Sequence, residues 1–189
     1  MRTHILAKKR LIAAAAQQMS IHTLTTTETP HSRHVLKTVI STNQMGAARA
    51  ALDIAAKYGI QTGGASPWNY LGVELWNTSN SLRERYLSCS KINMSRADAT
   101  IIFRFHKDYL LDECIEYCRI SPRLLVLRHL VLSDVSLESC MGAIAFMRGA
   151  NVRVLNICGH NHNFAPKNRI IHDGLDIILN PEVYGAIPC

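Results

Sequence analysis

Two polar segments of the sequence combine residue types that bind small anions or metal ions. The first, S-T-N-Q-M-G-A-A-R at residues 41–49, leads from an apolar run into an alanine-rich segment typical of a helix. A helix start presents unpaired backbone N–H groups and a positive partial charge, which suit a phosphate or another oxyanion. Hydroxyl, amide and guanidinium side chains would add further donors. The predicted ligand contacts are Ser41, Thr42, Asn43, Gln44, Gly46, Ala47 and Arg49.

The spacing of this first segment leaves a second interpretation open, in which the same residues only cap the helix. The segment is not a Walker A loop, because it lacks the Gly-Lys-Ser/Thr ending of that motif. It therefore predicts an anion-binding helix start without naming the anion.

The second segment is C-G-H-N-H-N-F-A-P at residues 158–166. Cys158, His160 and His162 alternate, so an extended chain would place all three on one face, as zinc or another transition metal requires. Cys158, however, ends a strand that we expect to be buried, where cysteine usually packs as a small apolar residue. We therefore favour direct ligand contacts from Gly159 and His160, and keep the metal site as the less favoured alternative.

These segments must be positioned by the elements around them, and the sequence predicts alternating strands and helices. We expect strands at 36–41, 60–64, 99–105, 123–127 and 152–158, and helices at 46–58, 81–96, 108–119, 136–149 and 173–179. Asp108 is the predicted N-cap of the helix at 108–119. Continuous apolar strands are buried on both faces, which predicts a three-layer, Rossmann-like α/β fold with a mostly parallel sheet. Ligands of such folds bind beyond the carboxyl ends of the strands. Both segments fall there, and so does Arg104, which we add to the candidate ligand-binding residues.

Length and composition are those of one globular domain. The chain has 189 residues, of which 48% are hydrophobic and 19% charged, and no run approaches the roughly 20 apolar residues of a membrane-spanning helix. We expect residues 1–34 to be a flexible, basic, Thr/Ser-rich leader, or alternatively a targeting peptide, and residues 35–189 to form a single domain. Cytoplasmic localisation is the default expectation.

The charge distribution disfavours a nucleic-acid-binding role. The net charge is +7, but residues 1–35 hold five basic residues against one acidic residue, so the predicted domain is only mildly basic. A nucleic-acid-binding domain usually carries a clustered basic stripe on the fold itself. The six cysteines are spread along the chain and are expected to be reduced, buried thiols rather than a disulfide framework.

The run I-S-T-N-Q-M-G-A-A-R-A-A-L-D, Ile40 to Asp53, resembles the S-G-G-Q-T-G-A-D-R-A-A-L-D signature of the bacterial molybdenum-cofactor carrier family. That family belongs to the circularly permuted branch of the SLOG (Rossmann-like, Lonely-Guy-related) superfamily. Further matches follow in the same order over residues 36–166, at Gly59-Ile60, Gly63-Gly64, Pro67, Tyr86, Asn93, Asp98-Ala99-Thr100, Leu155-Asn156 and Gly159. The resemblance implies a homo-oligomeric binding protein for the molybdenum cofactor or a nucleotide-like phosphate compound.

The departures from that signature bear on the ligand. Thr42 and Asn43 stand where the family has paired glycines, and Met45 replaces a threonine. The stretch R-F-H-K-D-Y-L-L-D-E after residue 103 contains no glycine, whereas the family has a second, glycine-rich phosphate loop there. Side chains fill space that a phosphate needs to reach backbone amides. These changes leave the implied fold unaffected, but they alter both of the loops that would hold the implied ligand.

Two alternatives to a binding protein follow. One is a Lonely-Guy-like hydrolase of nucleoside monophosphates, but its P-G-G-x-G-T-x-x-E motif is absent, and Asp112 and Glu113 are the nearby acids that follow the altered loop. The other is a ligand-free domain that acts through protein contacts. We rank the binding protein first, the interaction domain second and the enzyme third.

Overall fold

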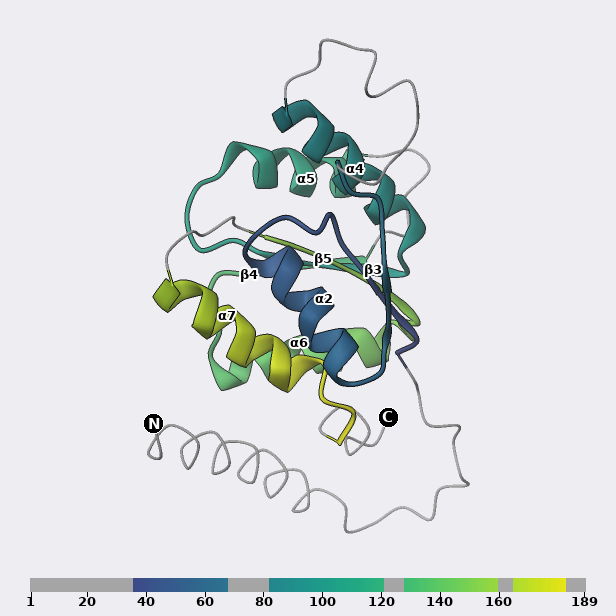
Figure 1. Ribbon diagram of the computed structural model, residues 1–189, viewed down its shortest axis with the longest axis vertical. Helices are drawn as coiled ribbons and strands as arrows, with labels where there is room; N and C mark the ends of the chain where they lie inside the picture. Colours follow the sequence, from purple (N-terminus) through teal and green to yellow (C-terminus); the bar gives the residue numbers. More distant parts are fainter. Residues whose placement is uncertain (1–35, 68–81, 121–127, 160–164, 183–189) are drawn as a thin grey trace.

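A five-stranded, all-parallel sheet forms the centre of the molecule (Figure 1). The computed structural model describes residues 36–67, 82–120, 128–159 and 165–182, so the predicted leader lies outside the described residues. The strand order is β2-β1-β5-β3-β4. The strands are β1 (Thr38–Ile40), β2 (Gln61–Gly63), β3 (Ala99–Phe103), β4 (Arg128–Leu132) and β5 (Val154–Gly159).

Helices cover both faces of this sheet, which confirms the predicted three-layer, Rossmann-like α/β fold (Figure 1). On one face lie α2 (Ala47–Lys57), α6 (Leu137–Gly149) and α7 (Ala165–Ile178), with α7 packed against both of the others. On the opposite face lie α4 (Leu82–Arg96) and α5 (Tyr109–Ile120), which pack against each other. No helix in the described ranges has the length and apolar character needed to span a bilayer.

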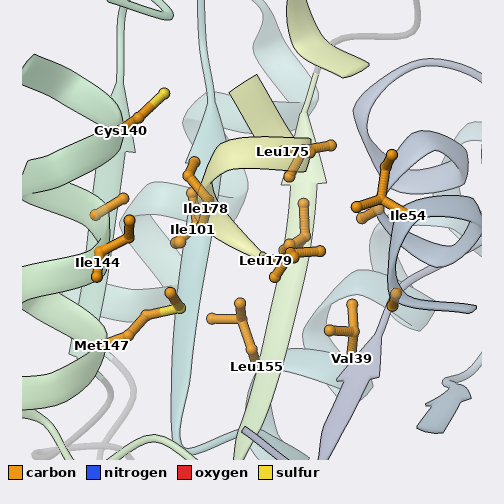
Figure 2. Close-up of a cluster of buried hydrophobic side chains, with 14 of the residues drawn as sticks. Val39, Ile54, Ile101, Cys140, Ile144, Met147, Leu155, Leu175, Ile178 and Leu179 are labelled. Carbon is orange, nitrogen blue, oxygen red and sulfur yellow. The ribbon is translucent and has the colours of Figure 1, made fainter. Parts of the chain in front are cut away.

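The larger hydrophobic core lies between the sheet and the α2/α6/α7 layer (Figure 2). Ile101 and Leu155 point from the strands toward this side, where they meet side chains such as Ile54, Ile144 and Leu175 from the helices. Their neighbours along the strands, Ile102 and Cys158, face the other layer because successive side chains of a strand point to opposite faces. The smaller core there adds Met94, Leu111, Cys114, Ile115 and Cys118.

Polar contacts fix the ends of the elements. Asp108 caps α5, since its Oδ1 accepts the N–H groups of Leu110 at 2.8 Å and Leu111 at 3.2 Å, and this confirms its predicted capping role. Asp98, before β3, accepts the N–H groups of Arg153 at 2.8 Å and Val154 at 2.7 Å through Oδ2. This carboxylate therefore ties the start of β3 to the start of β5.

One buried carboxylate joins two helices of the larger layer. Asp176 of α7 is 3% exposed, accepts the Tyr58 hydroxyl at 2.8 Å and pairs with Lys57 Nζ at 2.6 Å. Burying a charge is unfavourable unless it is paired and hydrogen-bonded. These contacts from the end of α2 meet that requirement and hold α2 against α7.

The fourth strand and the last helix have bounds other than those predicted. The strand predicted at 123–127 lies outside the described residues, and the strand that pairs with β3 is Arg128–Leu132. The sequence R-L-L-V-L-R-H-L-V-L contains two consecutive apolar runs, and periodicity alone does not distinguish them. The last helix begins at Ala165 instead of at residue 173. Its Pro166 stands in the first turn, where proline is tolerated because no intrahelical N–H bond is needed.

Candidate functional site

A cavity of about 120 Å³ lies at the carboxyl ends of β1 and β5, between the start of α2 and the α4/α5 layer. Thr42, Gln44 and Ala48 form its wall on the side of β1 and α2, and Cys158 and Gly159 line it from β5. The opposite wall comes from α4 and α5, through Tyr86, Leu87, Ser90, Asp108, Leu110, Leu111 and Cys114. The predicted anion-binding segment therefore does face a cavity, at the edge of the sheet where α/β folds bind ligands.

The backbone of the β1–α2 turn is held in place by buried hydrogen bonds. The Ser41 hydroxyl donates to the Ile157 carbonyl at 2.7 Å, and the Ser41 N–H donates to the Gly63 carbonyl at 3.0 Å. Thr42 follows at 3% exposure, lines the cavity, and has no hydrogen-bond partner for its hydroxyl among the described residues. Of the two predicted hydroxyl contacts, Ser41 thus positions the turn, whereas Thr42 presents a buried polar group to the cavity.

The first turn of α2 has amide groups with no backbone partner among the described residues. Gly46 is the N-cap residue, with a φ of 97° that disfavours other residues, and no side chain caps the helix. The first backbone bonds run from Arg49 N to the Gln44 carbonyl at 2.9 Å and from Ala50 N to the Gly46 carbonyl at 3.0 Å. The N–H groups of Ala47 and Ala48 precede these bonds, so they carry the positive end of the helix dipole.

Arg49 lies outside the cavity wall. Its Nε donates to Asp53 at 3.0 Å and its Nη1 donates to Asn43 Oδ1 at 3.1 Å, and its side chain is 53% exposed. Asn43 adopts a φ of 59°, a left-handed conformation that asparagine tolerates better than most residues. Arg49 therefore braces the turn, and its predicted direct contact with a ligand stays a prediction.

The thiols of the cavity wall are buried and protonated. Burial raises the pKa of Cys114 to about 12, and burial raises the pKa of Cys158 well above 9.0. Thiolates, and not thiols, are nucleophiles and metal ligands. The described residues contain no group of three metal-ligating side chains, and His160 and His162 lie outside the described residues. The metal site with Cys158 and the ligand contact at His160 both stay predictions.

Arg104, the candidate after β3, forms an ion pair with Asp112 at 2.6 Å and does not line the cavity. His106 and Lys107, in the altered loop, are exposed. Glu113 lies 3.9 Å from Lys91 of α4. The structure therefore brings the first candidate segment and Gly159 together at the cavity, but it places Arg104 in a contact with α5.

Several residues that carry the family resemblance have a structural role in supporting the site. A Cβ on Gly64, where φ is 118°, would lie 2.5 Å from the Ser41 carbonyl oxygen and 2.7 Å from its nitrogen. Buried Asn93 accepts Ala65 N–H at 2.6 Å and donates to the Ala65 carbonyl at 3.0 Å. A Cβ on Gly159 would lie 2.8 Å from the Cβ atoms of Ala47 and Phe103. The two glycines and Asn93 thus allow three segments to pack closely around the turn.

Sequence reasoning did not assign site roles to the α4 and α5 wall. Asp108 was predicted as a helix cap, and Tyr86 was matched to the family, but neither was placed at a ligand. The rule that ligands bind at the carboxyl ends of parallel strands applies equally to the β3–α5 connection. That signal alone would have drawn attention to Asp108.

The matched family agrees with this geometry. Residues 39–173, more than half of the chain, match the model of the circularly permuted YpsA SLOG family. The chain belongs to this family. The match confirms the resemblance predicted from residues 40–53, and it continues into α7, beyond the range over which we expected it.

A solved structure supports the same fold for this SLOG-family chain. It is the 1.45 Å crystal structure of a protein from Syntrophus aciditrophicus whose name proposes it as a molybdenum carrier. The two chains share 24% sequence identity with a TM-score of 0.55, over 76% of this chain and 95% of the other. At this identity the likeness concerns the fold. A comparison with curated proteins yields no match.

Proposed function

We propose that this SLOG-family protein is a binding protein that carries a small phosphate-bearing ligand of the nucleotide or pterin type. The observation that carries the proposal is the cavity between the uncapped start of α2 and the α4/α5 layer. It contains a buried threonine hydroxyl without a partner among the described residues. A hydroxyl at the wall of a cavity can donate a hydrogen bond to a ligand that enters it.

The phosphate end of the ligand belongs at the start of α2. The N–H groups of Ala47 and Ala48, the dipole of α2 and the Thr42 hydroxyl supply donors there. No lysine, arginine or histidine is among the described residues that line the cavity. The phosphate is therefore bound by backbone amides and hydroxyls rather than by a charged clamp.

The molybdenum cofactor is the cargo that we propose first. The resemblance of residues 40–53 implies it, and a carrier of molybdenum is what the name of the Syntrophus protein proposes for that protein. The cofactor combines a pterin with a phosphate, and its phosphate suits the hydrogen-bond donors at the start of α2.

Binding without catalysis is favoured over the two alternatives. An N-glycosidase needs a carboxylate at the sugar and a cation on the phosphate. Here Asp108, the acid that lines the cavity, is the cap of α5, and Arg49 lies outside the wall. A domain repurposed for protein contacts alone would have side chains filling the site, whereas a cavity of about 120 Å³ is retained.

Native mass spectrometry of the untreated full chain tests the proposal and also reports the predicted homo-oligomer. We expect a retained mass that matches a nucleotide or a pterin compound. If the protein is recovered empty, we expect GMP, AMP or 6-hydroxymethylpterin to shift the mass when added. A chain that stays unshifted with all of these compounds contradicts the proposed function.

A matched pair of variants locates the bound phosphate. Thr42→Val removes the cavity hydroxyl at nearly constant volume and should weaken binding of the retained ligand about tenfold, the effect of one hydrogen bond to a charged group. Thr62→Val, on the exposed edge strand β2, is the control and should leave affinity unchanged. Equal affinities of the two variants would move the phosphate away from Thr42.

A further inference from the structure

Three exposed basic side chains lie at the edge of the sheet opposite the cavity. Lys37 precedes β1, Arg153 precedes β5 and Arg128 begins β4. All five strands are parallel, so their starts meet at one edge, whereas the cavity lies at the carboxyl ends of β1 and β5. We call these three residues the basic row. The proposed cargo site uses none of them.

The pairing of the strands holds the basic row in line. The N–H groups of Lys37 and Thr38 both donate to the Arg153 carbonyl, at 2.9 and 3.0 Å, so Lys37 lies beside Arg153. Arg128 is the register partner of Ala99, the first residue of β3, and β3 is the strand between β4 and β5. Neighbouring strands lie about 4.8 Å apart, so the basic row spans about 14 Å from β1 to β4.

The three side chains also share one face of the sheet. Successive side chains of a strand alternate between faces, so residues an even number of positions apart point the same way. Each member of the basic row lies two or four positions before a strand residue of the larger core, namely Val39, Leu155 and Leu132. The basic row therefore lies on the α2/α6/α7 side, where Arg128 Nη1 donates to the Gly149 carbonyl at the end of α6, at 3.4 Å.

The basic row forms no ion pair within the part of the chain that the structure describes. Asp98, which precedes β3, lies between the strands that carry the row. Its Oδ2 is engaged by the backbone, since it accepts the N–H groups of Arg153 at 2.8 Å and Val154 at 2.7 Å. Like charges that are held close together repel one another, so an anion that covers the row would be favoured.

We propose that the basic row is the docking surface for a short acidic segment of a partner protein. Arginine and lysine pair with carboxylates, and arginine, which makes up two of the three residues, is enriched at protein interfaces. An extended segment rises about 3.3 Å per residue, so four or five residues cover the row. A partner bound there leaves the cavity at the opposite edge open, so this inference goes beyond the proposed function and does not depend on it.

A nucleic acid suits the basic row less well than an acidic protein segment does. Proteins that bind single strands stack the bases on aromatic side chains, and the row contains none. A duplex-binding protein makes about 6–10 phosphate contacts, which is more than three cations supply. The experiment therefore includes an oligonucleotide as a competing probe.

Fluorescence anisotropy of a fluorescein-labelled octaglutamate peptide, titrated with the full chain at low ionic strength, tests the docking surface. The triple variant Lys37→Gln/Arg128→Gln/Arg153→Gln should bind the peptide about tenfold more weakly than the wild type, the effect of losing three exposed ion pairs.

The matched control is Arg83→Gln/Lys107→Gln/Arg169→Gln. It removes the same number of positive charges from exposed positions at or near the starts of α4, α5 and α7, at the carboxyl end of the sheet. This variant should bind the peptide nearly as tightly as the wild type does. Equal losses in the two variants would show that binding follows net charge, and would overturn the inference.

The remaining outcomes also decide the inference. Unchanged peptide affinity in the variant of the basic row overturns it. Tighter wild-type binding of a labelled oligothymidylate than of the peptide, lost in the same variant, would make the partner a nucleic acid and overturns it as well. If the triple variant fails to fold, Lys37→Gln/Arg153→Gln replaces it, with Arg83→Gln/Lys107→Gln as the control.

Thr42→Val separates this inference from the proposed function. The variant changes the cavity at the opposite edge, so it should bind the peptide as the wild type does. Loss of peptide binding in Thr42→Val would place the peptide at the cavity and contradict the docking surface. A chain that binds the peptide through the basic row but binds no nucleotide or pterin overturns the proposed function and supports this inference.

Discussion

The two faces of the sheet bury different kinds of side chain. The α2/α6/α7 face buries a large cluster of aliphatic side chains from all three helices and the strands between them (Figure 2). The α4/α5 face buries three thiols and Met94 in a smaller cluster, along with polar Asn93, Thr100 and Asn156. The cavity opens on this second face. One layer therefore supplies most of the hydrophobic stabilisation, and the other retains polar groups and space for a ligand.

This division explains how a single small sheet combines stability with an open cavity. Interiors packed at crystal-like density leave little room for a ligand. Polar groups buried near a cavity cost stability unless they are hydrogen-bonded, and Asn93 meets that cost through both polar groups of Ala65. Substitutions of comparable residues on the two faces should therefore change the free energy of unfolding by unequal amounts.

The largest contrast is expected at two adjacent residues of β3. Ile101 and Ile102 are both fully buried, but Ile101 faces the larger core and Ile102 the smaller one. Isoleucine-to-alanine changes in cores cost about 2–5 kcal/mol, with more lost where the surroundings cannot relax. We expect Ile101→Ala near the upper end and Ile102→Ala near the lower end, as measured by urea unfolding. Equal losses would contradict the asymmetry.

A smaller loss is expected from Asn93→Ala on the α4/α5 face. The change leaves the buried N–H and carbonyl of Ala65 without their partner, which costs about 1–3 kcal/mol. Urea unfolding measures the loss, and Ser95→Ala, an exposed position on the same helix, is the control with an expected change near zero. A loss no larger than that of the control would show that the amide contributes nothing to holding the loop after β2.

The thiols predict a pH dependence of stability. Burial raises the pKa of Cys114 to about 12 and the pKa values of Cys118 and Cys140 to about 11. The unfolded chain then loses these protons first, near pH 9, so the folded state binds more protons and stability falls as pH rises above 9. At pH 10 the loss is about 1 kcal/mol for each thiol.

The two faces contribute unequally to this slope. Cys114, Cys118 and Cys158 lie on the α4/α5 side, and Cys140 lies on the other. Replacing the three by alanine should flatten the decline in unfolding free energy between pH 7.5 and 10 more than Cys140→Ala does. The difference in slope is the measurement, because other groups titrate equally in all variants. Similar slopes for the two variants would show that the thiols do not set the dependence.

The smallest expected effect is an increase in the free energy of unfolding. Gly142 lies inside α6 on an exposed face, and a Cβ there would meet nothing within 4 Å. Gly142→Ala should stabilise the fold by about 0.5–1 kcal/mol, because alanine loses less backbone entropy in a helix.

Gly159→Ala is the opposite case and should lower the melting temperature, since its Cβ would lie 2.8 Å from Ala47 and Phe103. A gain at both positions would contradict the close packing around Gly159.

Local patterns predicted most of the fold, and long-range packing accounts for what they missed. The apolar run of Ala99–Phe103 and the cap at Asp108 are local signals, and the structure confirms both. The position of β4 depends on which of two similar apolar runs pairs with β3, and that choice is made by the sheet. Likewise, nothing local indicates that α7 begins before residue 173 except a proline that its first turn accepts.

The candidate site was predicted on one side only. The rule for parallel sheets located the β1–α2 turn and Gly159 from the sequence, and both line the cavity. Neither α4 nor α5 was recognised as the facing wall, because the layer to which a helix belongs is not encoded in its periodicity. Arg49 was predicted to reach the ligand, but side-chain direction depends on partners such as Asn43 and Asp53, which spacing does not reveal.

The last strand among the described residues, β5, occupies the middle of the sheet. β5 pairs with β1 on one side and with β3 on the other, so β1–β2 and β3–β4 are two separate pairs until Val154–Gly159 arrives. Synthesis proceeds from the N-terminus, so both strand pairs are made before β5. Until β5 follows, the inner edges of β1 and β3 have no strand to pair with. Joining them requires contacts distant in sequence, which slow folding and prolong exposure of those edges. The hydrogen bond from the Ser41 hydroxyl to the Ile157 carbonyl also needs β5, so the β1–α2 turn at the cavity and the complete sheet form together.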